Sequence, residues 1–105
     1  MAQFDVYSNP STNSNKAYPY LVDIQSPVIS DIATRIVIPL SKKIDFKNTA
    51  LKGLTLELNY EGEQLVLLTP QLSAVPAKLL KQPIGSLSHL RDEIIATLDF
   101  AITGV

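Results

Sequence analysis

The segment Gly85–Val105 limits the choice of fold more than any other, because its apolar residues recur at the spacing of a helix. They are Leu87, Leu90, Ile94, Ile95, Leu98, Ala101 and Ile102, which line one side of a helix. Asp92 and Glu93 fall in or near the first turn, where the helix dipole favours acidic groups. Ser86 or Ser88 can cap the start. The segment predicts one amphipathic helix at the carboxyl end.

The predicted helix runs into an apolar ending instead of a polar tail. Ile102, Thr103, Gly104 and Val105 close the sequence, and we expect a free carboxylate beside an apolar side chain. Chain ends often pack against the fold or fray, so the residues alone favour a docked terminus over a binding surface.

The segments before the helix alternate in polarity or are rich in β-branched residues, as strands are. The expected strands are Gln3–Tyr7, Ala17–Ser26, Arg35–Leu40, Leu54–Tyr60 and Gln64–Thr69, with Gln71–Ala77 as a short extended piece. Leu54, Leu56 and Leu58 are expected to face inward in a hairpin that turns at Glu61–Glu63. Pro39 is expected to end the pairing of its strand, because proline has no N–H to donate.

Two connections interrupt this pattern. Ser8–Lys16 is polar, with no reason to order itself. Pro27–Ala33 sets Val28 beside Ile29, which are either anchors into the core or a contact patch.

Strands first and a helix last predict a mainly β fold: a small antiparallel sheet, or a partly closed barrel, with one helix packed against it. The 105 residues are expected to form a single domain over residues 1–105. Charged residues make up only 18% of the chain, which suggests that a partner, another copy, covers part of the surface.

Composition narrows the function classes. The net charge of −1 gives no reason to expect direct binding of nucleic acid or an anionic membrane. There is no cysteine, which fits a reducing cytoplasm. The amino terminus lacks the pattern of a signal peptide, and we expect a soluble intracellular protein.

Few residues of this sequence could support catalysis. His89 is the only histidine, and a position near the helix start suits a cap or a surface residue better than a general base. No spacing of acidic residues suggests a metal site, and the four glycines form no phosphate-binding loop. We expect no enzyme, no catalytic residue, no metal and no cofactor.

Several segments together resemble the CcdB toxin family, the toxic half of bacterial toxin–antitoxin pairs. The matching residues are Gln3, Phe4, Val6 and Tyr7, then Val22–Ser26, Arg35–Leu40, Ser73–Pro76, Leu87–His89 and the closing Gly104 and Val105. Their order and spacing are similar to the family over essentially the whole chain, and closer to its chromosomal versions than to the plasmid-borne one.

The resemblance implies a homodimer of CcdB/Kid/MazF-type domains, each a small barrel-like five-stranded antiparallel sheet with a C-terminal α-helix. It implies a toxin that binds the DNA gyrase A subunit and traps the gyrase–DNA cleavage complex, and a CcdA-like antitoxin that neutralises it. The implied gyrase-binding residues are Thr103, Gly104 and Val105, supported by Ile102, Asp99, Val28 and Ile29. The plasmid toxin has tryptophan where this chain has Thr103, and threonine cannot stack on gyrase arginines as that ring does.

Two alternatives stay open. A ribonuclease toxin of the Kid/MazF kind needs a positioned acid and base with basic residues for the RNA, and only His89, Arg35, Arg91 and scattered acids are available. A relative that has lost gyrase binding and only sequesters antitoxin is suggested by Thr103.

Overall fold

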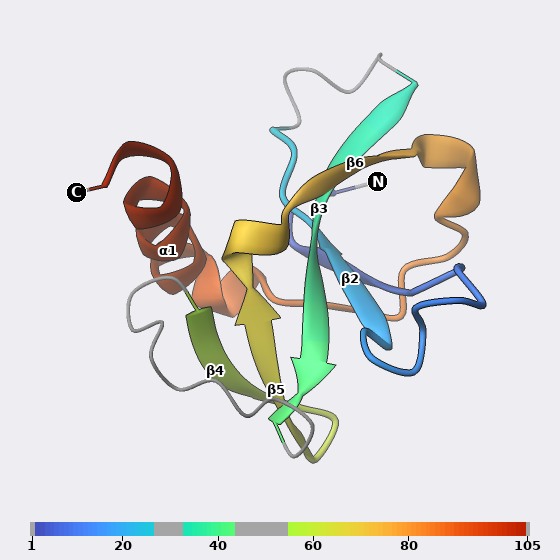
Figure 1. The fold of residues 1–105 in the computed structure, drawn as a ribbon, viewed down its shortest axis with the longest axis horizontal. Coiled ribbons are helices and arrows are strands. Elements are labelled where there is room, and N and C mark those ends of the chain that lie inside the picture. The colour runs from blue at the N-terminus through green and yellow to red at the C-terminus, as the bar shows by residue number, and fades with distance from the viewer. Residues whose placement is uncertain (1, 27–32, 44–54, 105) are drawn as a thin grey trace.

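A computed structural model describes residues 2–26, 33–43 and 55–104 (Figure 1). The strands are β1 (Asp5–Ser8), β2 (Tyr20–Asp23), β3 (Thr34–Lys42), β4 (Thr55–Tyr60), β5 (Glu63–Leu68), β6 (Ser73–Pro76) and β7 (Gly85–Ser86). The short 3-10 turns η3 (Thr69–Gln71), η4 (Ala77–Leu79) and η5 (Ser88–Leu90) follow β5, β6 and β7, and α1 (Arg91–Thr103) comes after η5.

These strands form one curled antiparallel sheet in the order β4-β5-β3-β2-β1-β7, with β6 paired to β3. Figure 1 shows α1 lying beside the β4–β5 end of the sheet. The mainly β class, with a half-barrel sheet and one carboxyl-terminal helix, is confirmed. All five expected strands take part, and the short strands β6 and β7 add to them.

The pairing of β3 corrects the prediction for Pro39. The strand does not stop there: Pro39 lies opposite Leu21, and β3 continues to Lys42. Even-numbered residues of β3 direct their backbone groups to β2, as the bond from Ile24 N to Ile36 O (2.9 Å) shows. The backbone of Pro39 therefore faces away from β2. On that side β3 pairs with β6 as far as Val37 and with β5 from Leu40 onward, so the missing N–H of Pro39 breaks no hydrogen bond of the sheet.

The β4–β5 hairpin is confirmed. Its turn is Glu61 and Gly62, with φ of 52° and 80°, and Tyr60 pairs with Glu63 across it. Positive φ at both central residues matches the twist of paired strands. Leu58 is buried and Glu57 is exposed, as the alternation predicts; Leu54 lies outside the described residues.

Both faces of the sheet are covered. The main core lies between the sheet and α1, where Val6, Val22, Ile38, Leu67, Leu87 and Ile94 are buried. A second cluster of Tyr7, Leu21, Val37 and Leu80, with Val75 packed against it, lies on the opposite face. Successive strand residues point to opposite faces, which explains why β1, β2 and β3 each bury side chains that are adjacent in the sequence.

The polar loop after β1 is ordered by one side chain, contrary to the expectation for residues 8–16. Asn9 Nδ2 donates to Ser14 Oγ at 3.1 Å and to the Tyr18 carbonyl at 2.8 Å. Asn9 Oδ1 accepts from the Ser11 N–H at 3.0 Å. An asparagine that bonds its neighbouring backbone organises a turn without any apolar burial.

The helix is confirmed with two corrections. Its N-cap position is held by Leu90, and Ser86 Oγ instead accepts from Ser88 N (3.2 Å) at the preceding turn η5. The buried side chains of α1 are Ile94 and Thr97, whereas Ile102, predicted on the apolar stripe, is 68% exposed. The contacts of α1 with the sheet run through β4 and η3, and its last turn extends beyond them (Figure 1).

Candidate functional site

The last turn of α1 presents a set of exposed side chains that we call the C-terminal tip: Asp99, Phe100, Ile102, Thr103 and Gly104. Phe100 is 42% and Ile102 68% exposed, and the other three are exposed as well. The structure therefore brings four of the sequence-predicted site residues, Asp99, Ile102, Thr103 and Gly104, together at one end of the molecule. The residues alone favour a docked ending and the family resemblance favours an exposed one; these four residues are exposed.

The backbone of the tip is shaped by two contacts within the helix. Thr103 Oγ1 donates to the Asp99 carbonyl at 2.6 Å, so this hydroxyl is engaged by its own helix. Gly104 has φ of 76° and donates its N–H to the Phe100 carbonyl at 3.0 Å, which ends the helix in the left-handed conformation typical of glycine.

Three further predicted site residues, Val28, Ile29 and Val105, lie outside the described residues. The strands on either side of residues 27–32 are described, and a buried polar cluster joins them. Arg35 and Asp23 are 2% and 0% exposed, and Arg35 Nη2 lies 2.7 Å from Asp23 Oδ2.

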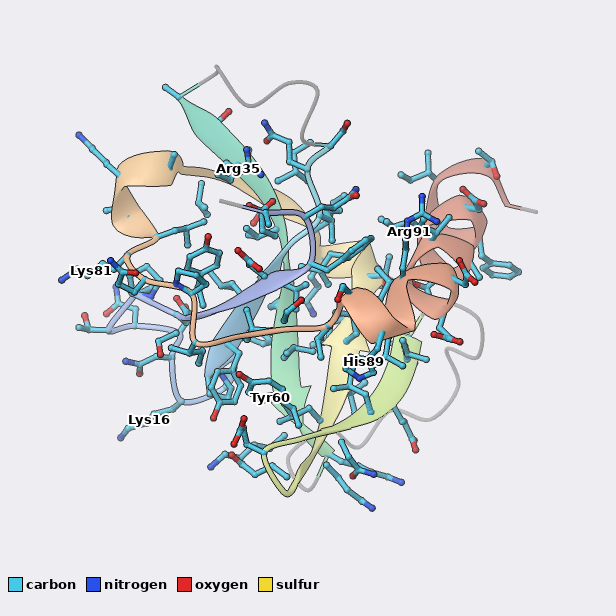
Figure 2. The ribbon with its side chains drawn as sticks, turned by 180° about the vertical axis from the view of Figure 1, so that it is seen from behind. Lys16, Arg35, Tyr60, Lys81, His89 and Arg91 are labelled. Atoms are coloured by element: carbon cyan, nitrogen blue, oxygen red, sulfur yellow. The ribbon has the colours of Figure 1, made fainter. Side chains whose placement is uncertain are left out.

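The residues considered for ribonuclease chemistry are not gathered into one site. His89 is exposed in η5, and Arg91 is exposed at the start of α1, next to Asp92 at 3.6 Å. Arg35 lies on β3, well away from both (Figure 2), and its guanidinium is committed to Asp23. Among the described residues, acidic and histidine side chains form no group of three that could hold a metal ion.

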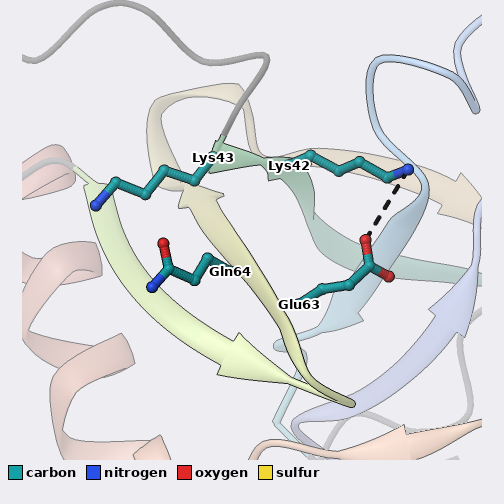
Figure 3. Close-up of a pocket in the computed structure, with 4 residues that line it drawn as sticks. All are labelled: Lys42, Lys43, Glu63 and Gln64. Atoms are coloured by element: carbon teal, nitrogen blue, oxygen red, sulfur yellow. Dashed lines mark ion pairs between the residues drawn. The ribbon is translucent and has the colours of Figure 1, made fainter.

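A surface hollow of about 430 Å³ lies at the end of β3 (Figure 3) and is lined by Lys42, Lys43, Glu63 and Gln64. Lys43 Nζ bonds Glu57 at 2.9 Å, and Lys42 Nζ lies 3.9 Å from Glu63. Each of these lysines faces a carboxylate across the protein surface.

The comparison with known families decides the assignment. The model of the family described as CcdB protein matches residues 3–104, nearly the whole chain. The chain belongs to the CcdB family. Membership implies a gyrase-poisoning toxin of a CcdA/CcdB system, with the gyrase A subunit and CcdA as partners, and CcdB toxins are non-enzymatic. No helix in the described part of this CcdB-family chain is long and apolar enough to cross a membrane.

Sequence reasoning missed the buried polar groups that support the CcdB-family fold. Thr97 Oγ1 accepts from Thr69 Oγ1 at 2.9 Å and donates to the Ile94 carbonyl at 2.8 Å, which fixes α1 against η3. A threonine on the predicted apolar side of a helix gives only a weak signal. The charged residues Asp23 and Arg35, inside otherwise apolar strands, indicate a buried polar pair more clearly.

Proposed function

We propose that this chain is a homodimeric, non-enzymatic toxin of the cytoplasm that binds the DNA gyrase A subunit and traps the gyrase–DNA cleavage complex. A CcdA-like antitoxin neutralises it. The C-terminal tip makes the first contact with gyrase, together with Val105, and Val28 and Ile29 make the second. The observation that carries the proposal is the exposure of Ile102, at 68%, in the last turn of a helix whose Ile94 is buried in the core.

The chemistry of the tip fits a cavity lined by arginines. Ile102 supplies an apolar contact, and the exposed Asp99 carboxylate can pair with a guanidinium. Thr103 offers its methyl group, because its hydroxyl already donates to the Asp99 carbonyl. The contact is therefore arranged differently from one built around a stacked aromatic ring.

Deleting Thr103–Val105 tests this proposal. Folding should change little, because the buried side chains of α1, Ile94 and Thr97, are retained. Growth inhibition on expression and gyrase-dependent DNA cleavage by the purified protein should both be lost. A matched surface variant, Lys81→Ala, should keep both activities. Undiminished toxicity of the truncated chain would end the proposal.

The two alternatives make different predictions in the same experiments. RNA cleavage by the purified protein would favour a ribonuclease, but the burial of Arg35 against Asp23 and the non-enzymatic family argue against that chemistry. Normal growth on strong expression, combined with tight antitoxin binding by the intact chain, would identify a relative that only sequesters antitoxin.

A further inference from the structure

Two buried threonines, which we call the threonine pair, join the helix to the sheet: Thr69 at the start of η3 and Thr97 in α1. Their side chains belong to residues that are 0% and 6% exposed. Thr69 Oγ1 donates to Thr97 Oγ1 at 2.9 Å, and Thr97 Oγ1 donates to the Ile94 carbonyl at 2.8 Å. Each hydroxyl proton therefore has a defined acceptor, and the bond has a defined direction.

Thr69 is itself held by the sheet. It follows directly after Leu68, which pairs with Thr55 of β4, and its carbonyl accepts from Leu72 N at 3.1 Å. The hydroxyl that Thr69 presents to α1 is thus placed by β4 and β5, the strands beside which the helix lies (Figure 1).

The neighbouring contacts of α1 with the core are apolar. Ile94 is fully buried, and Ile95 and Leu98 are partly buried against the same core cluster. Apolar contacts have little directional preference, so they hold a helix on a sheet without fixing its rotation about its own axis. The threonine pair adds a directional bond between α1 and the rest of the fold.

The C-terminal tip depends on that rotation, because its side chains are exposed and do not hold themselves against the sheet. Thr97 is the buried residue of α1 nearest to the tip, which begins two residues later in the same helix. Successive helix residues are about 100° apart, so a rotation of α1 by one residue would turn every tip side chain by about 100°.

Stability alone is a weak reason for two hydroxyls at this place. A buried hydrogen bond contributes little net free energy, and replacing both partners by apolar side chains of the same shape is often nearly neutral. Direction is what an apolar pair does not supply.

We infer that Thr69 and Thr97 are positioning residues for the gyrase contact. The bond between them fixes the rotation of α1, so that Asp99 and Ile102 meet the gyrase A subunit already placed. The inference rests on the proposed function and deepens it, because it names the residues that orient the tip.

Two paired variants test the inference, since valine and serine each keep a different part of threonine. The valine pair, Thr69→Val with Thr97→Val, keeps the shape and removes both hydroxyls, so it should melt at nearly the same temperature as the unmodified chain. Its affinity for purified gyrase A subunit should fall between about 5-fold and about 100-fold, the range expected when two interface side chains must be ordered on binding.

The serine pair, Thr69→Ser with Thr97→Ser, keeps both hydroxyls and removes both methyl groups. It should melt at a lower temperature, because buried methyl groups are lost, and yet bind the gyrase A subunit as the unmodified chain does. A merely structural role predicts the opposite order, in which affinity follows stability. A serine pair that binds no better than the valine pair would overturn the inference.

Leu80→Ala is the matched control for lost stability, because Leu80 is buried on the face of the sheet opposite α1. It should lower the melting temperature and leave the affinity unchanged when binding is measured well below the melting temperature of every variant. An affinity loss equal to that of the valine pair would contradict the inference.

The direction of the tip can also be measured without gyrase. Residual dipolar couplings of the N–H bonds of residues 99–103, compared with those of β3, β4 and β5, report how the last turn of α1 lies relative to the sheet. In the valine pair these couplings should differ from those of the unmodified chain, and in the serine pair they should match them. Identical couplings in all three proteins would overturn the inference.

A double-mutant cycle links the threonine pair to the tip. The affinity loss of the valine pair should shrink in an Ile102→Ala background, where less of the contact depends on the direction of the tip, and full additivity would count against the inference. If the unmodified chain binds no gyrase A subunit, the proposed function fails and the inference fails with it. If that chain binds and the valine pair binds equally well, only the inference fails.

Discussion

Gly104 ends α1 with φ of 76°, and an added Cβ there would meet no atom within 4 Å. Any loss of stability when Gly104 is substituted must therefore come from the backbone conformation and not from a steric clash. Gly104→Ala should lower the free energy of unfolding by about 1 kcal/mol, because the left-handed region disfavours residues with a Cβ. It should also weaken gyrase binding by redirecting the tip.

Chemical denaturation and gyrase binding measure the two effects of Gly104→Ala. Gly104→Asn is the control, since asparagine tolerates this conformation better, and it should retain more of both properties. An alanine variant as stable and as active as the asparagine variant would contradict the role given to the left-handed cap.

Tyr7 has a buried hydroxyl for which the described part of the chain supplies no hydrogen-bond partner. Burial, followed by the carboxylates of Asp5 and Asp23, raises the pKa of Tyr7 above its usual 10.0, and Arg35 opposes the shift. As pH rises past 10.0, the unfolded tyrosine ionises while the folded one keeps its proton. The unfolded chain then binds fewer protons, so the free energy of unfolding falls in that window.

Tyr7→Phe should make this alkaline decline shallower. Near neutral pH the variant should be at least as stable as the unmodified chain, because a buried hydroxyl without a partner is lost. Urea unfolding at pH about 8 and about 11, on either side of the ordinary tyrosine pKa, measures the difference. Burial also raises the pKa values of Tyr20 and Tyr60, but these tyrosines contribute equally to the variant and to the unmodified chain. An identical loss of stability at alkaline pH in the two proteins would therefore contradict the assignment to Tyr7.

At the scale of elements, α1 offers a matched pair of isoleucines. Ile94 is fully buried against the sheet, and Ile102 is 68% exposed. Ile94→Ala should lower the free energy of unfolding by about 2–5 kcal/mol, through lost apolar contact and the cavity left behind. Ile102→Ala should change it by less than about 0.5 kcal/mol and yet weaken gyrase binding.

Thermal unfolding of the two isoleucine variants, with gyrase binding measured well below either midpoint, checks this pair. Equal losses of stability would show that the face of the helix has been assigned wrongly.

Elements with a local signal could be predicted from the sequence. The hairpin follows from the alternation through Leu58 and the turn at Gly62, and the helix follows from the spacing of Leu90, Ile94 and Leu98. Features that depend on partners distant in the chain could not be predicted. Whether Pro39 interrupts a ladder depends on where β6 and β5 begin and end.

The candidate site, too, could be predicted from the sequence only in part. The family motifs pointed to the tip, and the structure shows four of its predicted residues exposed. The exposure of Ile102 could not be predicted from periodicity, because a stripe does not reveal where the underlying sheet stops. The buried ion pair of Asp23 with Arg35 depends on β2 and β3 lying side by side, which no single segment encodes.

At the scale of the whole molecule, the low charge content of 18% favours the proposed homodimer, in which another copy covers part of the surface. Light scattering after size-exclusion chromatography should give twice the chain mass of 11.5 kDa. A single-chain mass at micromolar concentration would contradict the proposed homodimer.

The pairing of β1 with β7 joins Asp5 to Ser86, almost the full length of the chain apart. A ribosome making this protein must therefore synthesise the chain as far as β7 before β1 can form this pairing, and α1 follows only after that. Prematurely terminated translation products lack both the closing strand and the tip. The residues proposed to contact gyrase follow β7 in the sequence, so they are synthesised only after both partners of the β1–β7 pair have been made.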